Sequence, residues 1–123
     1  EVPEPCRLAT IDVSFISLTR ILPALRSVLA EGAEVMALVK PQFEVGRAQV
    51  GRGGLVRKPA LHLAALRRVA EAAQELGYAV RGACPSPIAG AEGNREFFLH
   101  LRRDGAPLAE PELDGVLRKA VEG

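Results

Sequence analysis

The sequence predicts an α/β domain with a mostly parallel sheet, and three observations lead to this prediction. Short apolar runs alternate with amphipathic stretches along the 123 residues, an order typical of strand–helix–strand units with right-handed crossovers. The apolar run at residues 34–40 shows no polar alternation, which is typical of a strand covered on both faces. Only about eleven residues separate Cys84 from Glu96. Because that is too short for a helical crossover, we expect the last two strands to be antiparallel.

The first half of the chain predicts two strands with a helix between them. Residues 7–13 form a short apolar run that ends in an acid, and we expect a strand there. Ser17 or Thr19 can cap the following helix, whose apolar residues recur with a period of about 3.6 residues. We expect this helix to run to about Glu31, with Gly32 as its C-terminal stop. The second strand is the apolar run described above.

The second half of the chain predicts a long loop followed by a helix, two strands and a terminal helix. Residues 41–57 form a seventeen-residue loop rich in glycine, and loops of this length in compact domains tend to be functional. The alanine-rich stretch at residues 59–76 predicts a helix that Gly77 closes. The remaining elements are expected at residues 78–83 and 96–102 (strands), 104–109 (linker) and 113–121 (terminal helix).

Composition and charge exclude several classes of protein. The chain is 48% hydrophobic and 25% charged, which is typical of a globular protein and excludes disordered and collagen-like chains. Sixteen basic residues against fifteen acidic ones give a net charge of +1, so any nucleic-acid-binding surface must be local. No apolar run approaches the roughly 18–20 residues of a membrane span, and we expect no membrane partner. Cys6 and Cys84 are too few and too far apart for a disulfide framework or a metal site. We expect reduced thiols, no metal and a cytoplasmic location.

Three charged residues lie at the ends of predicted strands. Asp12 and Lys40 follow the first two strands, and Glu96 begins an antiparallel one. Ligands of open α/β sheets bind beyond the carboxyl ends of the parallel strands. Adjacent strands are about 4.8 Å apart, so the three side chains converge within roughly 10 Å if their strands are neighbours. The alternative is that each residue only marks where a strand leaves the core for solvent.

The glycine-rich loop is basic. It contains Arg47, Arg52 and Arg57, and Lys58 follows directly. The loop lacks the Lys-Ser/Thr pair of a phosphate-binding loop and the third glycine of a dinucleotide fingerprint, which excludes nucleoside triphosphate binding. Because cations at the start of a helix oppose its dipole, they indicate an anionic partner. We expect these four residues to contact RNA phosphates, with a solvated basic loop as the alternative.

Several segments of the chain resemble one protein family. They are residues 12–18 (DVSFISL), 39–46 (VKPQFEVG), 53–57 (GGLVR), 86–88 (SPI) and 93–99 (GNREFFL). In this order they resemble the TlyA family, also known as hemolysin A. The family consists of S-adenosylmethionine-dependent ribosomal RNA 2′-O-methyltransferases with an FtsJ-like domain. The resemblance implies that residues 1–103 are the C-terminal half of a Rossmann-like methyltransferase domain. Residues 104–123 would be a linker and a terminal helix packed on that domain.

The resemblance also implies roles for individual residues. Asp12, Lys40 and Glu96 match three members of the family's Lys-Asp-Lys-Glu catalytic group. Lys40 would be the base, Asp12 would position it, and Glu96 would complete the network. We expect Asp12 to face the charged end of the cofactor, S-adenosylmethionine, with Ser14 and Phe15 as further cofactor contacts. Phe15 could rest against an adenine ring, and a position in the core is its alternative. The resemblance implies that the substrate is ribosomal RNA or a ribosomal subunit. The other lysine, the glycine-rich cofactor turn and the family's RNA-binding domain would all lie before Glu1.

Elementary chemistry then predicts the behaviour of the isolated chain. A ribose 2′-hydroxyl is a poor nucleophile until its proton is removed, and a lysine accepts that proton only when it is uncharged. Carboxylates beside Lys40 favour its charged form, whereas a second lysine and the cofactor's positive charge oppose it. Because the chain lacks that second lysine, we expect it to be inactive alone.

Other interpretations remain open at this stage. The main alternative is a non-catalytic α/β RNA-binding or scaffold module with polar strand ends. Membrane lysis is disfavoured, because the amphipathic stretch at residues 113–121 is short and lacks aromatic anchors. If residues 7–13 normally pair with a strand outside this chain, they leave an open sheet edge. We therefore expect the chain to self-associate through that edge.

Overall fold

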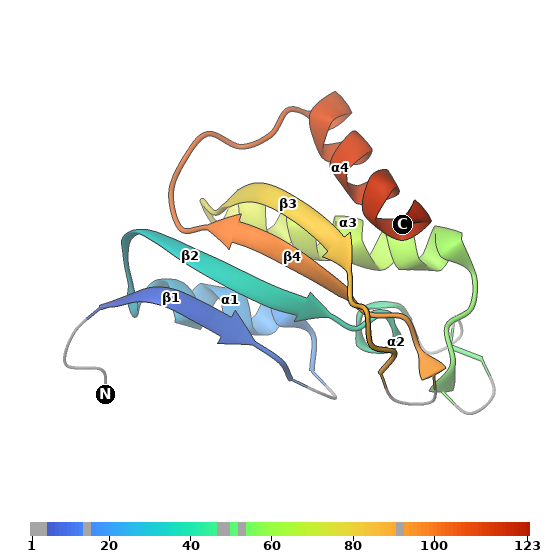
Figure 1. The fold of residues 1–123 in the computed structure, drawn as a ribbon. Helices are drawn as coiled ribbons and strands as arrows, with labels where there is room; N and C mark the ends of the chain where they lie inside the picture. The colour runs from blue at the N-terminus through green and yellow to red at the C-terminus, as the bar shows by residue number, and fades with distance from the viewer. Residues whose placement is uncertain (1–4, 14–15, 47–49, 52–53, 91–92) are drawn as a thin grey trace.

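Four strands form one mixed sheet in the computed structural model, which describes residues 5–13, 16–46, 50–51, 54–90 and 93–123. The elements are β1 (Cys6–Ile11), α1 (Leu18–Arg26), β2 (Leu29–Val39), α2 (Pro41–Glu44), α3 (Pro59–Glu75), β3 (Ala79–Pro85), β4 (Phe97–Arg102) and α4 (Glu110–Glu122). The strand order is β1-β2-β4-β3 (Figure 1). β1 is parallel to β2, and β4 is antiparallel to both of its neighbours. The predicted α/β class and the antiparallel final strand are confirmed.

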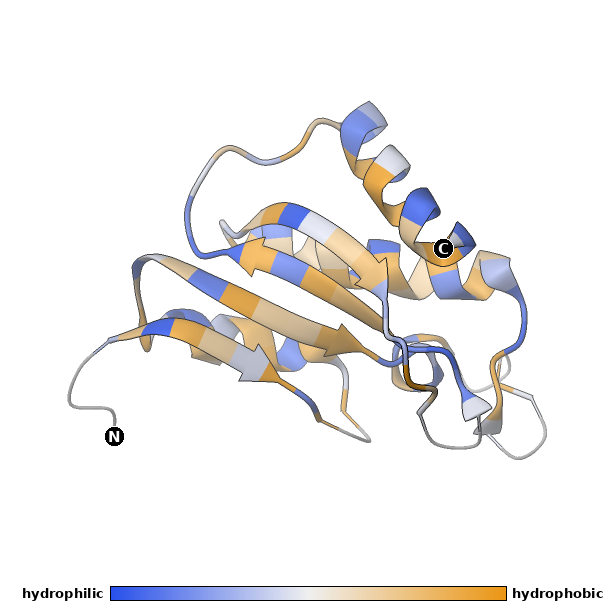
Figure 2. Cartoon of the chain, in the orientation of Figure 1, coloured by the Kyte–Doolittle hydropathy of each residue, from blue (hydrophilic) through white to orange (hydrophobic). Residues whose placement is uncertain are grey.

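Helices cover one face of this sheet. Helices α1 and α3 lie behind the strands in Figure 1, and α4 packs beside β3 and α3. Along β2, Val35, Ala37 and Val39 are fully buried, and the residues between them are half-buried. Figure 2 shows apolar residues along the lengths of β2 and β4. The prediction that the second strand is covered on both faces is therefore wrong for the described chain, because its helices pack on one side of the strand.

Helix α1 is shorter than predicted. Ser17 caps its N-terminus, and the Ser17 hydroxyl accepts a hydrogen bond from the Thr19 backbone N–H. The helix ends at Arg26 instead of about Glu31, and β2 begins only three residues later. Gly32 is not a helix stop: it lies within β2 with φ +73°, and its N–H donates to the Asp104 carboxylate at 2.9 Å. A glycine with positive φ occurs at strand bends as well as at helix ends. The presence of a glycine at position 32 therefore does not show whether a helix ends or a strand bends there.

The second helix-forming region agrees with the sequence pattern. Helix α3 buries Leu66, Val69 and Ala73, and Gly77 follows it with φ +97°. The predicted loop at residues 41–57 contains the short helix α2, so it is not structureless throughout.

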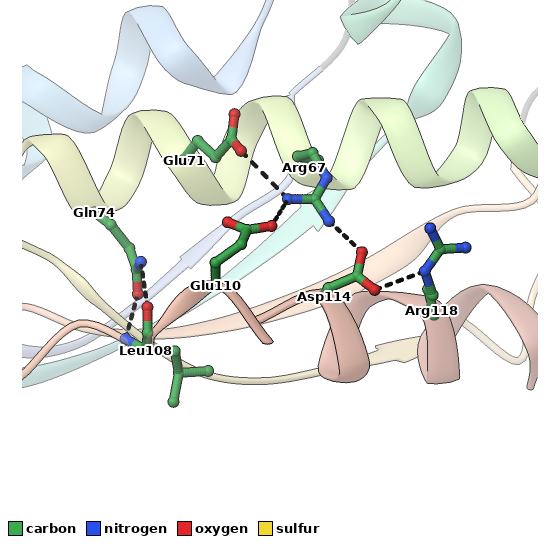
Figure 3. Close-up of polar contacts among 7 residues, drawn as sticks. All are labelled: Arg67, Glu71, Gln74, Leu108, Glu110, Asp114 and Arg118. Atoms are coloured by element: carbon green, nitrogen blue, oxygen red, sulfur yellow. Dashed lines mark hydrogen bonds and ion pairs between the residues drawn. The ribbon is translucent and has the colours of Figure 1, made fainter. Parts of the chain in front are cut away.

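Helix α4 is fixed to α3 by a polar network (Figure 3). Arg67 of α3 forms ion pairs with Glu71, Glu110 and Asp114. The side chain of Gln74 accepts a hydrogen bond from the Leu108 N–H at 3.0 Å and donates to the Leu108 carbonyl at 3.3 Å. Below this network α4 buries its apolar side, with Leu113, Leu117, Ala120 and Val121 in the core.

Candidate functional site

Asp12 and Lys40 meet at one edge of the sheet. They directly follow β1 and β2, and because these neighbouring strands are parallel, their carboxyl ends lie at the same rim. Lys40 Nζ lies 2.6 Å from Asp12 Oδ1. The Lys40 side chain is 13% exposed, whereas that of Asp12 is 67% exposed. The pair therefore consists of a mostly buried ammonium and a carboxylate that remains open to solvent.

Glu96 lies at the same rim, on the next strand of the sheet. The pairing of Val39 with Phe97 places Glu96 opposite Lys40, one step beyond the ladder. The predicted condition that the three strands are neighbours therefore holds. Glu96 is 6% exposed, and its carboxylate packs against the backbone of Gly90. A Cβ at Gly90 would lie 1.7 Å from Glu96 Oε2, so only glycine leaves room for this carboxylate.

A further buried carboxylate, Glu44, lies close to the rim. It is 4% exposed and lies at the end of α2. Its oxygens accept hydrogen bonds from the Ser17 hydroxyl at 2.6 Å and from the Leu18 N–H at 2.9 Å. Burial raises the pKa of Glu44 above its usual value, and the hydrogen bonds from Ser17 and Leu18 partly oppose that rise.

Asn94 joins the glycine-rich loop to the loop before β4. It is buried, and its side chain accepts from the Val56 N–H and donates to the Gly54 carbonyl, both at 2.7 Å. His62 Nε2 lies 2.9 Å from the Val56 carbonyl, and the His62 ring packs against Phe97. These contacts hold residues 54–56, at the end of the basic loop, against the core beside Phe97, the residue that follows Glu96.

The other predicted site residues fall into two groups. Arg57 and Lys58 are exposed immediately before α3, where cations can reach a ligand. The predicted cofactor residues Ser14 and Phe15 and the predicted RNA contacts Arg47 and Arg52 lie outside the described residues.

Comparison with known proteins identifies the family. The model of the FtsJ-like methyltransferase family matches residues 1–103. The chain belongs to the FtsJ-like methyltransferase family. The relatives of this FtsJ-like chain include YqxC of Bacillus subtilis, 49% identical over 117 residues that cover 91% of this chain and 42% of the relative. Another is the 16S/23S rRNA (cytidine-2'-O)-methyltransferase TlyA of Mycobacterium tuberculosis, 47% identical over 118 residues that cover 94% of this chain and 44% of the relative.

The resemblance to TlyA and hemolysin A is thereby confirmed, and a solved structure agrees with it. The FtsJ-like chain matches a structure described as "Putative hemolysin from Streptococcus thermophilus" with a TM-score of 0.87 and 44% identity. The match covers 94% of this chain and 41% of that one. The chain spans about two fifths of the length of the curated relatives it matches.

Sequence reasoning missed four residues of the FtsJ-like site. They are Gln42, Glu44, Gly90 and Asn94, all of which lie in loops or in the short helix α2. Both polar atoms of the Gln42 side chain are buried and have no hydrogen-bond partner among the described residues. Three of the four lie inside segments that resemble the family, which was the one available signal. A polar residue in a loop is usually exposed, so composition alone gave no reason to expect buried ones.

No described helix is both long enough and apolar enough to span a bilayer. The described histidine, cysteine, aspartate and glutamate residues include no group of three or more that could hold a metal ion.

Proposed function

We propose that this chain takes part in S-adenosylmethionine-dependent methyl transfer to a ribose 2′-hydroxyl of ribosomal RNA, as the C-terminal half of a Rossmann-like methyltransferase domain. The observation that carries the proposal is the Asp12–Lys40 pair at the carboxyl ends of two parallel strands, with Glu96 on the adjacent strand. Membership in the FtsJ-like family supports the reaction class. The name of the mycobacterial relative, a 16S/23S rRNA (cytidine-2'-O)-methyltransferase, supports the RNA substrate. Such a substrate places the reaction in the cytoplasm.

The chemistry of this rim fits the cofactor. S-adenosylmethionine carries positive charge on its sulfonium and on its ammonium group. The Asp12 carboxylate, 67% exposed beyond β1, is an acceptor suited to such a cation. Asp12, with Ser14 and Phe15 next to it in the sequence, would hold the cofactor. When bound, the cofactor supplies an electrophilic methyl group.

Lys40 is the proposed base. In its uncharged form, Nζ takes the proton from the 2′-hydroxyl, which makes the oxygen nucleophilic. The Asp12 carboxylate, 2.6 Å from Nζ, orients it. The isolated chain is inactive in this proposal, because it does not contain the second lysine of the family's catalytic group.

Four basic residues are the proposed RNA contacts. Arg57 and Lys58 are exposed at the start of α3, and Arg47 and Arg52 complete the basic set in the sequence. These cations pair with backbone phosphates, so they contribute affinity that weakens with salt and carries no sequence preference.

Replacing Lys40 tests the proposal. In the full-length protein, Lys40→Ala should abolish methyl transfer to ribosomal RNA, because the substrate hydroxyl then has no base. Lys119→Ala is the matched control, since Lys119 is an exposed lysine in the last turn of α4. Urea unfolding of both variants shows whether the fold is retained. Unchanged methyl transfer by a folded Lys40→Ala variant would favour a non-catalytic RNA-binding or scaffold module instead.

A further inference from the structure

Glu44 ties together the two segments that carry the Asp12–Lys40 pair. One segment runs from Asp12, after β1, to Ser17, the cap of α1. The other runs from Lys40, after β2, to Glu44 at the end of α2. The Lys40–Asp12 ion pair joins the segments where they leave the sheet. Glu44 joins their far ends through its hydrogen bonds from Ser17 and Leu18.

Each oxygen of the Glu44 carboxylate accepts a hydrogen bond, so its burial is compensated by specific contacts. A carboxylate removed from water is costly unless hydrogen bonds compensate, and Glu44 is 4% exposed. One of its oxygens accepts from a hydroxyl and the other from the first backbone N–H of α1. That N–H has no partner within the helix, and the positive end of the helix dipole favours a carboxylate there.

We propose that Glu44 is a positioning residue that holds Asp12 and Lys40 in contact. The effect of Glu44 on catalysis rests on the function proposed above, whereas its effect on the contact between Asp12 and Lys40 does not. With Glu44 in place, the segments leaving β1 and β2 are fixed at both ends. Without it, the hydrogen bonds that join Glu44 to Ser17 and Leu18 are lost, and the ion pair, which is open to solvent on the Asp12 side, has less support.

The charge state of Glu44 links this arrangement to pH. Burial raises its pKa, while Ser17, Leu18 and the guanidinium of Arg68 on α3 lower it. Arg68 Nε lies 4.0 Å from Glu44 Oε1 and is the charged group that faces it from the packed helix. Because the pKa is raised in the folded state, folding favours the protonated form. The contribution of Glu44 to stability therefore decreases as pH rises from the unfolded value, about 4.5, through the raised one. The Glu44→Gln variant lacks this dependence.

Competitive lysine labelling tests the proposal on the chain itself. A trace amount of acetic anhydride is added, and acetylation of Lys40 is measured by mass spectrometry relative to the exposed Lys119. An ion-paired ammonium reacts slowly, because acylation needs the amine lone pair. Asp12→Asn removes the partner and should raise the relative labelling of Lys40 several-fold. Glu44→Ala removes both acceptor oxygens while leaving Asp12 and Lys40 intact, and it should raise the labelling to a similar level.

Matched variants and a direct readout make the result decisive. Glu112→Gln, a glutamate exposed in the first turn of α4, should leave labelling unchanged. The amide proton of Leu18 should move with the titration of Glu44 in the wild type and stop doing so in Glu44→Gln. Ser17→Ala removes one of the two hydrogen bonds and should give intermediate labelling.

Two results would overturn the proposal. The first is that Asp12→Asn raises the labelling of Lys40 while a folded Glu44→Ala variant does not, which would make Glu44 a helix cap alone. The second is that Asp12→Asn itself has no effect, which would mean that the pair does not hold Lys40 in solution.

Methyl transfer by the full-length protein provides the catalytic readout. Glu44→Ala should lower kcat by about 10²-fold if the pair is displaced by about 1 Å, with KM for RNA retained. If the wild-type protein transfers no methyl group, the proposed function fails, while the labelling result still decides the positioning role.

Discussion

The contact between Gly90 and Glu96 gives the sharpest prediction. Gly90→Ala places a Cβ 1.7 Å from Glu96 Oε2. Real Cβ atoms essentially never come closer than 3.0 Å to a heavy atom, so the carboxylate must move by at least 1.3 Å, the difference between the two distances. Because a misplacement of about 1 Å can cost about 10²-fold in rate, methyl transfer by the full-length protein should fall by about that factor.

Stability should change much less than activity. Overpacking lowers the free energy of unfolding by about 1–3 kcal/mol. Alanine also restricts the unfolded chain more than glycine does, which raises the free energy of unfolding by about 0.4–1 kcal/mol. Urea unfolding of the 123-residue chain should therefore show a net loss of no more than about 2.6 kcal/mol. A loss of stability lowers activity only if it unfolds the protein. A variant that is folded but inactive therefore shows that the position of Glu96, and not stability, is the cause.

A control and a double variant complete the test. Gly115→Ala in α4 meets no atom within 4 Å and should stabilise the chain by about 0.5–1 kcal/mol, with no effect on activity. Combining Gly90→Ala with Glu96→Ala removes the clash and should recover the lost stability relative to Glu96→Ala. Wild-type activity in Gly90→Ala, or a full stability penalty that persists without the Glu96 carboxylate, would refute this reasoning.

Two further predictions concern stability and association. Gln42→Met removes two buried polar atoms without partners and should raise the free energy of unfolding by about 1–3 kcal/mol. Gln74→Met breaks the hydrogen bonds between Gln74 and Leu108 and should lower the free energy of unfolding. A destabilised Gln42→Met variant would contradict this account. β1 is an edge strand of the described sheet, and Leu8 on it is 65% exposed. We therefore expect the chain to associate in a concentration-dependent way in analytical ultracentrifugation. Leu8→Lys should weaken this association, whereas the control Ile88→Lys, in a distant exposed loop, should not. A chain that stays monomeric at high concentration would count against this prediction.

The rim of the site was predictable because it depends on strand direction. Asp12 and Lys40 follow apolar runs connected by a helix, and this order dictates parallel strands whose ends coincide. The position of Glu96 was predictable from the short connection after Cys84. Because that connection is too short for a crossover, the last strand runs antiparallel and begins at the same edge of the sheet. What the pattern did not reveal was that β4 lies between β2 and β3.

The remaining errors have local physical causes. Gly32 has the positive φ expected at a helix end but lies in a strand, where Asp104 accepts from its N–H 72 residues later in the chain. No pattern within α1 reports such a distant partner. Glu44 was missed for a similar reason, since its burial depends on Ser17 and Leu18 from another segment. Apolar periodicity identifies the elements, but single long-range hydrogen bonds decide where they end.

The position of β4 between β2 and β3 dictates when the site can form. During vectorial synthesis β3 emerges from the ribosome before β4, yet within the described sheet β4 is the strand with which β3 pairs. Glu96 immediately precedes that last strand. Nascent chains that stop before residue 96 therefore hold Asp12 and Lys40 without the third charged residue of the rim. Glu96 takes its place opposite Lys40 only when β4 has been synthesised and pairs with β2.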